Sequence, residues 1–372
     1  MIVGVPREIK VHEYRVGLVP AGARELVDRG HQVVVQAGAG LGVGLSDQAY
    51  MDVGAEIVDS AADVFEQADM VVKVKEPQQR EIKYIREGQV IFTYLHLAAD
   101  PQLTRSLMAR NCVAVGCETV TGARGGLPLL APMSEVAGRM AVQVGAHHLE
   151  KEQGGRGVLL AGVPGVLPAS VVIVGGGVAG ANAARMALGQ QARVTVIDND
   201  IAKLDELDRL YGRELDTLYS TADHIEDAVQ GADLVIGCVL RPGASAPKLV
   251  TRDMVRRMPN DAVLVDVAID QGGCFETSRP TTHADPVYTE EGCIHYCVTN
   301  MPGAVARTST FALTNATIRF ILDIAEKGYR RALAEDAHLR DGLNLAFGAV
   351  THKGVAQSLG HAFTAPQEAL GL

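Results

Sequence analysis

The sequence predicts an α/β protein with two Rossmann-like, doubly wound parallel sheets, and two observations support this expectation. Short apolar segments alternate with helix-like segments along most of the 372 residues, which is the pattern of repeated strand and helix units. A chain of this length also exceeds what one hydrophobic core usually covers, so a second domain is expected.

The first alternating series covers the amino-terminal 130 residues and predicts an open α/β sheet. Two of its expected strands are followed by Lys75 and His96. Ligands of such sheets bind beyond the carboxyl ends of the strands, so both residues are site candidates. The expected elements are strands at 2–5, 31–36, 70–74, 89–95 and 112–115, and a helix near 21–29.

A long helix is expected to separate the two series. Ser134 can cap it, because a serine hydroxyl accepts a bond from a first-turn amide, and the glycine-rich residues 154–157 can end it. The second series then alternates in the doubly wound manner, and residues after 302 are predicted to be mainly helical. Its expected strands lie at 170–174, 193–197, 234–239, 262–267 and 294–298.

Composition excludes several classes of partner. The formal net charge of −10, without any run of Lys or Arg, argues against nucleic acid and anionic membranes. The charged start of the chain lacks a cleavable secretion signal, so a cytoplasmic location is expected. The uncharged run 157–184 is broken by prolines and glycines, which favours a loop, a buried strand and a phosphate turn over a membrane helix.

The six cysteines show no paired Cys-x-x-Cys spacing and are expected to be reduced core thiols. Cys293, His295 and Cys297 share one face of an expected strand, so a metal site is conceivable there. A packed strand is the stronger interpretation of this spacing. No metal is therefore predicted.

A dinucleotide-binding pattern opens the second series. An apolar strand leads into Gly175-Gly176-Gly177-Val178-Ala179-Gly180 and a helix, and the next strand ends in Asp198. These glycines permit a tight turn and let a pyrophosphate approach the helix amino terminus, while Asp198 can accept both ribose hydroxyls. Val178 and Ala179 lie in the same turn and are expected cofactor contacts. Asp198 would repel a 2′-phosphate, so NAD is favoured over NADP. Lys203 leaves NADP open, although a solvated helix charge also explains it.

Four polar residues follow expected strands or lie in adjoining loops. Asp270 follows an apolar strand and precedes two glycines, a place where backbone can approach a ligand. Arg15 and Lys75 can clamp a substrate carboxylate, and His96 can exchange a proton near neutral pH. Taken singly, each has a structural alternative: a surface charge for Arg15 and Lys75, a structural histidine, or an aspartate that caps a turn.

The chain resembles the alanine dehydrogenases, a family related to the NAD-binding subunit of pyridine nucleotide transhydrogenase, and the resemblance runs nearly end to end. It rests on many blocks that occur in the same order. These blocks are 4–10 with Glu13 and Arg15, 73–77, 94–98, 131–138, the glycine turn, 265–276, 278–283 and 298–304.

The resemblance implies reversible oxidation of L-alanine to pyruvate and ammonium with NAD. It implies that Arg15 and Lys75 hold the carboxylate, that His96 and Asp270 serve as the acid/base pair, and that Met133 and Asn300 line the substrate pocket. Further cofactor contacts are expected from Ser134, Asp198, Lys203, Ser220, Val239, Leu240, Val267, Ala268, Ile269, Asp270, Arg279, Val298, Asn300 and Met301.

The resemblance also implies a discontinuous catalytic domain, residues 1–130 plus 305–372, beside an NAD-binding Rossmann domain, residues 131–304. The active site is expected in the cleft between the domains, and a hexamer is the expected assembly. Arg241 departs from the family, where an aliphatic residue is expected beside the nicotinamide nucleotide.

The expected mechanism transfers hydride from the alanine Cα to nicotinamide C4 through iminopyruvate, which then takes up water and releases ammonia. His96 is expected to move the protons, and Asp270 to orient the amine or water and stabilise the iminium. Two other functions remain open: a coenzyme-binding transhydrogenase subunit and a non-catalytic NAD-responsive regulator. Glycine, glyoxylate or a longer amino acid also remain possible substrates.

Overall fold

The computed structural model describes residues 1–239 and 246–371. The chain forms two compact units, and the first of them is discontinuous in sequence. Unit 1 comprises Met1–Met133 and Val305–Leu372, and unit 2 comprises Ser134–Ala304. Both are α/β units, as the sequence predicts.

Unit 1 contains a sheet in the order β15-β14-β6-β5-β4-β1-β2-β3. The six strands from β6 to β3 are parallel to one another. Because the order reverses at β1 and β4, the switch point of this doubly wound sheet lies between these two strands. The strands are β1 (Ile2–Val5), β2 (Gln32–Gln36), β3 (Glu56–Val58), β4 (Met70–Val72), β5 (Val90–Thr93), β6 (Val113–Gly116), β14 (Leu343–Ala346) and β15 (Ala349–Val350).

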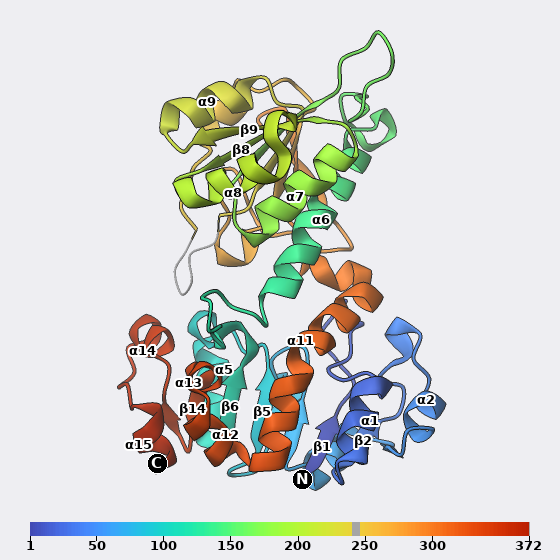
Figure 1. Ribbon diagram of the computed structural model, residues 1–372, viewed down its shortest axis with the longest axis vertical. Coiled ribbons are helices and arrows are strands. Elements are labelled where there is room, and N and C mark those ends of the chain that lie inside the picture. The colour runs from blue at the N-terminus through green and yellow to red at the C-terminus, as the bar shows by residue number, and fades with distance from the viewer. Residues whose placement is uncertain (240–245, 372) are drawn as a thin grey trace. The chain divides into compact units, whose positions relative to one another are not determined.

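Helices cover both faces of this sheet, because successive strand residues point to opposite sides. Val90 and Phe92 of β5 belong to a core under the long helix α11, which crosses the sheet in Figure 1. Ile91, between them, belongs to the core on the other face, with Phe65 of α3. The helices are α1 (Pro20–Asp28), α2 (Asp47–Met51), α3 (Ala61–Gln67), α4 (Gln79–Ile82), α5 (Pro101–Ala109), α11 (Ala306–Lys327), α12 (Tyr329–Glu335), α13 (Ala337–Asp341), α14 (Lys353–Leu359) and α15 (Pro366–Leu370).

The carboxyl-terminal segment differs in part from the expected helical tail. It is mainly helical, but β14 and β15 extend the sheet as antiparallel strands beside β6. The turn between them places Phe347 at φ 50° and Gly348 at φ 81°.

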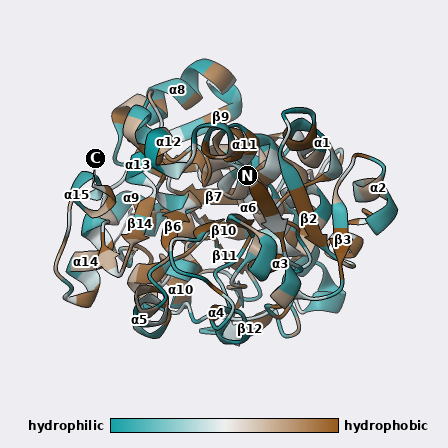
Figure 2. Ribbon diagram, turned by 90° about the horizontal axis from the view of Figure 1, so that it is seen from below, coloured by the Kyte–Doolittle hydropathy of each residue, from teal (hydrophilic) through white to brown (hydrophobic). Residues whose placement is uncertain are grey.

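Figure 2 shows hydrophobic residues along strands such as β1 and β2, and hydrophilic residues on helices such as α1 and α3.

Unit 2 contains a second doubly wound sheet, in the order β12-β13-β11-β10-β7-β8-β9. Only β12 is antiparallel to its neighbour. The switch point lies between β7 and β10. The strands are β7 (Ser170–Val174), β8 (Arg193–Asp198), β9 (Leu215–Tyr219), β10 (Leu234–Gly237), β11 (Val263–Asp266), β12 (Val287–Glu290) and β13 (Cys293–Tyr296), and the helices besides α6 are α7 (Val178–Gly189), α8 (Ile201–Tyr211), α9 (Ala222–Gln230) and α10 (Arg252–Arg256).

The long helix α6 (Ala131–His148) starts earlier than the sequence indicates. Ser134 lies inside the helix rather than capping it, so that expectation was wrong. Pro132 explains the earlier start, because proline lacks an amide hydrogen and suits the first helical turn. Gly138 lets α6 approach α7 closely, since a Cβ there would lie 2.0 Å from the Ala179 carbonyl oxygen. None of the helices described is long and apolar enough to cross a membrane.

Candidate functional site

Arg15 lies at the switch point of unit 1, in the loop between β1 and α1, and its side chain is buried. Glu13 forms a bidentate ion pair with its guanidinium group, in which Nε lies 2.7 Å from Oε1 and Nη2 lies 2.6 Å from Oε2. Nη1 lies 3.0 Å from the sulfur of Met133. The structure therefore brings together two of the predicted substrate residues and adds Glu13, which fixes the guanidinium plane.

Burial and the Glu13 carboxylate act on Arg15 in opposite directions. Burial alone would lower the pKa of the guanidinium, but the hydrogen bonds and the charge of Glu13 outweigh it and raise the pKa above its ordinary value. Arg15 therefore carries its charge at every pH at which the protein is folded. A fixed, oriented cation of this kind suits recognition of a carboxylate.

Lys75 follows β4 at the same switch point and is buried. Its backbone amide donates to Glu8 Oε1 at 3.1 Å. Its carbonyl accepts a bond from the Thr93 hydroxyl at the end of β5, at 2.9 Å. The peptide groups around Lys75 are therefore bonded to the loop after β1 and to the end of β5.

His96 is exposed and stands just beyond β5. Its backbone is in the left-handed region, at φ 50° and ψ 36°, a conformation that is uncommon for residues other than glycine. The Glu118 carboxylate holds it there by accepting the His96 amide at 2.6 Å and the Leu95 amide at 3.1 Å. The ring stacks on Tyr94 with centroids 6.0 Å apart. A carboxylate and an aromatic ring thus fix the position of this imidazole.

The glycine turn lies at the switch point of unit 2, between β7 and α7. Gly175 has φ 104°, and Gly177 is the N-cap of α7. A Cβ on Gly180 would lie 1.8 Å from the Gly175 carbonyl oxygen, whereas a Cβ on Gly177 would meet no atom within 4 Å. The close approach at Gly180 explains why the turn needs a glycine there. The space beside Gly177 leaves room at the amino terminus of α7, where a phosphate can accept amide hydrogens.

Asp198 ends β8, and its buried carboxylate binds the glycine turn. One oxygen accepts the Gly176 amide at 2.6 Å, and the other accepts the Asp200 amide at 2.8 Å. Lys203 is half-exposed, and its Nζ lies 3.7 Å from the Asp198 carboxylate. Ser220 lies beside this group, with its amide bonded to the Asp198 carbonyl oxygen at 3.0 Å.

The loop that carries Asp270 is folded around another carboxylate, Asp266, which is completely buried at the end of β11. Asp266 accepts the Ala268 amide at 3.1 Å, the Cys274 amide at 2.8 Å and the Ser278 hydroxyl at 2.5 Å. Burial raises the pKa of Asp266 above its ordinary value, although these bonds oppose the shift. Asp270 itself is exposed in the short 3-10 turn Ile269–Gln271.

The other predicted contact residues of unit 2 occupy several places. Ser134 is in α6, Val239 follows β10, and Arg279 is exposed with its guanidinium 3.8 Å from the Tyr288 ring centroid. Asn300, at φ 62°, accepts a bond on its carbonyl oxygen from His283 at 3.1 Å. Val298, Ala268, Ile269 and Met301 are buried and Val267 is half-buried. Leu240 and Arg241 lie outside the described residues.

The histidine and cysteines considered as a metal site pack in the sheet. Both ring nitrogens of His295 have protein partners, the Thr277 hydroxyl at 2.7 Å and the Cys293 carbonyl oxygen at 3.1 Å. Tyr288 stacks on the ring, with centroids 5.1 Å apart. Within the described parts of the chain, no three His, Cys, Asp or Glu side chains gather as metal ligands would.

We expect His295 to make unit 2 sensitive to acid. Burial lowers its pKa from an ordinary value of 6.5 to about 4, so between these values the unfolded chain binds a proton that the folded chain does not. The contribution of His295 to stability is therefore fully present above pH 6.5 and is lost as the pH falls toward 4, by up to about 3 kcal/mol. Urea unfolding across this range should show a shallower pH dependence for His295→Leu than for the wild type.

The matched control is His224→Leu, which removes an exposed histidine of the same unit. It should leave the pH dependence of unfolding unchanged. Equal slopes for the wild type and His295→Leu would contradict the assignment.

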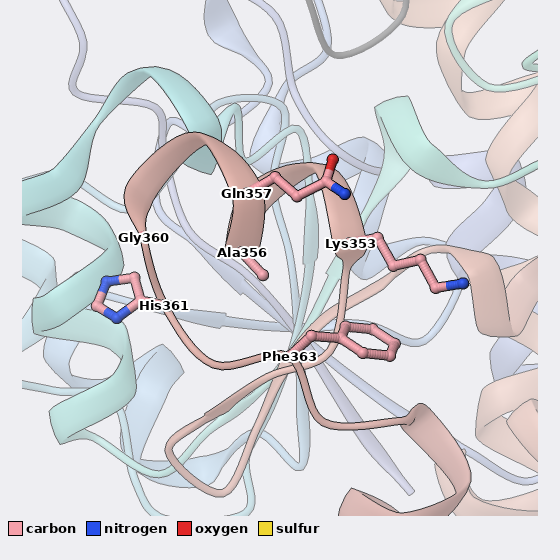
Figure 3. A pocket seen from close by; sticks show the side chains of 6 residues that line it. All are labelled: Lys353, Ala356, Gln357, Gly360, His361 and Phe363. Atoms are coloured by element: carbon pink, nitrogen blue, oxygen red, sulfur yellow. The ribbon is translucent and has the colours of Figure 1, made fainter.

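A surface hollow of about 620 Å³ lies elsewhere, on α14 and the loop after it. Figure 3 shows Lys353 and Phe363 on one side of this loop and His361 on the other. The Lys353 ammonium lies 5.6 Å from the Phe363 ring centroid. None of the predicted site residues lines this hollow, so it is not the site described above.

Comparisons with known proteins agree with this architecture. Residues 4–137 match the family model "Alanine dehydrogenase/PNT, N-terminal domain", and residues 141–353 match "Alanine dehydrogenase/PNT, C-terminal domain". The chain belongs to the alanine dehydrogenase/PNT family. Membership of this family makes the protein an oxidoreductase.

Relatives within the alanine dehydrogenase/PNT family match over the whole chain. An alanine dehydrogenase of Halomonas elongata is 58% identical over 97% of both chains, and one of Bacillus subtilis is 53% identical over 100% of this chain and 98% of its own. A solved L-alanine dehydrogenase has a TM-score of 0.93 at 49% identity, covering 97% of this chain and 99% of its own. A transhydrogenase of Sinorhizobium meliloti has a TM-score of 0.82 at 26% identity, covering 94% and 100%.

Three carboxylates support the predicted site residues and were not predicted as site residues themselves; Glu8 and Asp266 are buried, and Glu118 is half-buried. Glu8 binds the backbone of Lys75, Glu118 that of His96, and Asp266 the loop of Asp270. Asp266 had a usable signal, because it is an acidic residue in an otherwise apolar strand. Glu8 and Glu118 carry no local signal of this kind, since their partners are 67 and 22 residues away.

Proposed function

We propose that the protein catalyses the reversible, NAD-dependent oxidative deamination of L-alanine to pyruvate and ammonium. The observation that carries this proposal is the chemistry at the two switch points. The one in unit 1 holds a buried, oriented Arg15 in the loop after β1 and a buried Lys75 in the loop after β4. The one in unit 2 holds the glycine turn and the Asp198 carboxylate, which accepts the Gly176 amide of that turn. Full-length identity to alanine dehydrogenases, at 58% and 53%, supports the substrate.

The residues of the unit 2 switch point fit NAD. The open space at Gly177, the amino terminus of α7 and the oriented Asp198 suit a pyrophosphate and an adenosine ribose. Asp198 disfavours a 2′-phosphate by its charge, although Lys203 offsets part of that charge. When bound, NAD supplies the hydride acceptor for the alanine Cα hydrogen.

In this proposal the chain's own residues hold the substrate and move its protons. Arg15 and Lys75 bind the carboxylate and so orient the Cα hydrogen, with Met133 and Asn300 as further pocket residues. His96 accepts and returns protons as water adds to iminopyruvate and ammonia leaves. Asp270 orients the amine or water and stabilises the cationic iminium. We further propose that the protein works as a hexamer in the cytoplasm.

Arg15→Ala is expected to raise the KM for pyruvate, because the ground and transition states both carry the carboxylate that Arg15 binds. It should also lower stability by about 3–5 kcal/mol, since the buried Glu13 loses its cation. Arg15→Lys is the control: it keeps a charge near Glu13 but loses the planar fork, so stability should recover more than KM does. Steady-state kinetics and urea unfolding measure the two effects. A normal KM in Arg15→Ala would exclude Arg15 from carboxylate binding.

The function itself is tested by NADH production from L-alanine and NAD at alkaline pH. Parallel reactions contain NADP in place of NAD, or glycine, serine or lysine in place of alanine. We expect a strong signal with alanine and NAD and a weak one with NADP. Reduction of NAD with glycine at a rate comparable to the rate with alanine would broaden the substrate class.

The similarity to a transhydrogenase makes a coenzyme-binding subunit the second function that the same assay must distinguish. A coenzyme-binding subunit would bind NADH tightly and oxidise no amino acid, and a non-catalytic regulator would behave in the same way. Tight NADH binding without turnover of any amino acid would therefore contradict the proposal. Hydride exchange between two nucleotides would then separate the transhydrogenase subunit from the regulator.

A further inference from the structure

A buried charge cluster lies beneath the end of β4 in unit 1. Lys73 Nζ is 3.1 Å from Glu8 Oε2 and 2.9 Å from Glu81 Oε1. The side chain of Lys73 is completely buried, and those of the two glutamates are nearly so. Burial alone would lower the pKa of the Lys73 ammonium, but the charges of Glu8 and Glu81 outweigh it and raise the pKa above its ordinary value.

Glu8 and Glu81 use their remaining oxygens differently. Glu8 Oε1 accepts the backbone amides of Val74 at 2.6 Å and Lys75 at 3.1 Å. Glu81 Oε2 accepts the amide of Gln78 at 2.7 Å, which caps the short helix α4. Of the two glutamates, Glu8 is therefore the one seen to bind the peptide that carries Lys75, whereas Glu81 binds that of Gln78.

The Lys75 peptide is held from its other side as well. The Thr93 hydroxyl donates to the Lys75 carbonyl oxygen at 2.9 Å, and Thr93 is completely buried. β4 ends at Val72, but backbone bonds toward β5 continue to Val74: the Lys73 amide donates to the Phe92 carbonyl oxygen at 3.1 Å, and the Val74 carbonyl oxygen accepts the Tyr94 amide at 3.3 Å. Glu8 and Thr93 extend this support to the amides of Val74 and Lys75 and to the carbonyl oxygen of Lys75.

Stability alone is a weak explanation for such a cluster. Buried ion pairs often add little net stability, because desolvation of the charges offsets their attraction. A buried carboxylate that accepts two adjacent amides does fix a loop in one conformation. The cluster is therefore better explained by the need to fix the position of the Lys75 side chain.

We propose that Glu8 is a positioning residue for substrate recognition: anchored by Lys73, it fixes the backbone of Lys75 so that the Lys75 ammonium meets the substrate carboxylate. This inference rests on the proposed function, which assigns Lys75 to the carboxylate. It adds Glu8 and Thr93 as residues on which the affinity for pyruvate and alanine depends, although neither contacts the substrate.

The test compares Glu8→Gln with Glu81→Gln. Both oxygens of each glutamate face donors, so in either variant the new amide group must turn one N–H₂ toward a donor. The two substitutions therefore disturb the cluster alike and leave Lys73 with one carboxylate. They differ in the backbone they release, which is that of Lys75 for Glu8 and that of Gln78 for Glu81.

We expect Glu8→Gln to raise the KM for pyruvate on the order of 10-fold and to change the KM for NADH less than about 2-fold. Glu81→Gln should change neither constant by more than about 2-fold. In a Lys75→Ala background, Glu8→Gln should have no further effect on the KM for pyruvate, because the side chain that it positions is absent.

Equal pyruvate constants in Glu8→Gln and Glu81→Gln would overturn the proposal, as would full additivity with Lys75→Ala. Thr93→Val provides a second route, since it keeps the shape of the side chain and removes only its hydroxyl. It should raise the KM for pyruvate in the same direction as Glu8→Gln. An unchanged constant in Thr93→Val would contradict the role of the Lys75 backbone.

Hydrogen exchange of the Val74 and Lys75 amides gives a readout that needs no activity. Exchange should accelerate in Glu8→Gln and not in Glu81→Gln. If the wild type turns over no amino acid, the proposed function fails while exchange still reports whether Glu8 anchors the loop. If the wild type is active and exchange is equal in both variants, the anchoring role fails alone.

Discussion

Asp270→Asn is expected to lower kcat for alanine oxidation by on the order of 1000-fold while the dissociation constant of NADH stays nearly unchanged. Asparagine has the shape of aspartate but neither its negative charge nor its basicity, so it can neither stabilise an iminium nor take up a proton. The loop should keep its conformation, because Asp266, and not Asp270, accepts the amides that hold it. Turnover and NADH fluorescence titration measure the two quantities.

The control for Asp270→Asn is Asp285→Asn, which removes a charge from an exposed position of the same unit. It should leave both constants unchanged. Unchanged turnover in Asp270→Asn would remove Asp270 from the mechanism. A loss of NADH affinity as large as the loss of turnover would instead make Asp270 a cofactor-binding residue.

Much of the fold could be predicted because both sheets have strong local patterns. The strand 170–174 was predicted with the bounds that β7 has, since its apolar run ends at a glycine turn. β3, β9 and β12 were missed, because edge strands are half-exposed and carry mixed sequences such as Leu-Asp-Thr-Leu-Tyr. β14 was missed because its pairing with β6 joins residues more than two hundred positions apart.

The candidate site likewise contains residues that local sequence predicts and residues that depend on contacts between distant parts of the chain. Arg15, Lys75, His96 and Asp270 follow strands or lie in adjoining loops, so a rule about the carboxyl ends of strands finds them. The carboxylates that support Lys75 and His96 lie far away in sequence: Glu8 reaches Lys75 across 67 residues, and Glu118 reaches His96 across 22. Such contacts depend on strand order, which spacing along the chain does not reveal. The left-handed conformation of His96 was likewise not predicted, because the Glu118 contact that accompanies it joins residues distant in the sequence.

That conformation makes His96→Asn an unusually clean variant, and we expect it to lower kcat by about 100- to 10,000-fold. Asparagine tolerates φ 50° better than most residues do, and the backbone amide of residue 96 can still donate to Glu118. The backbone should therefore stay in place while the imidazole is lost. His96→Ala should lose turnover to the same extent but should also lower stability by about 1 kcal/mol, because alanine fits this region poorly. Steady-state kinetics and urea unfolding separate the two effects. If His96 were only structural, His96→Asn would retain turnover and the loss in His96→Ala would follow its stability; equal loss of turnover with unequal stability instead assigns the proton transfer to the ring.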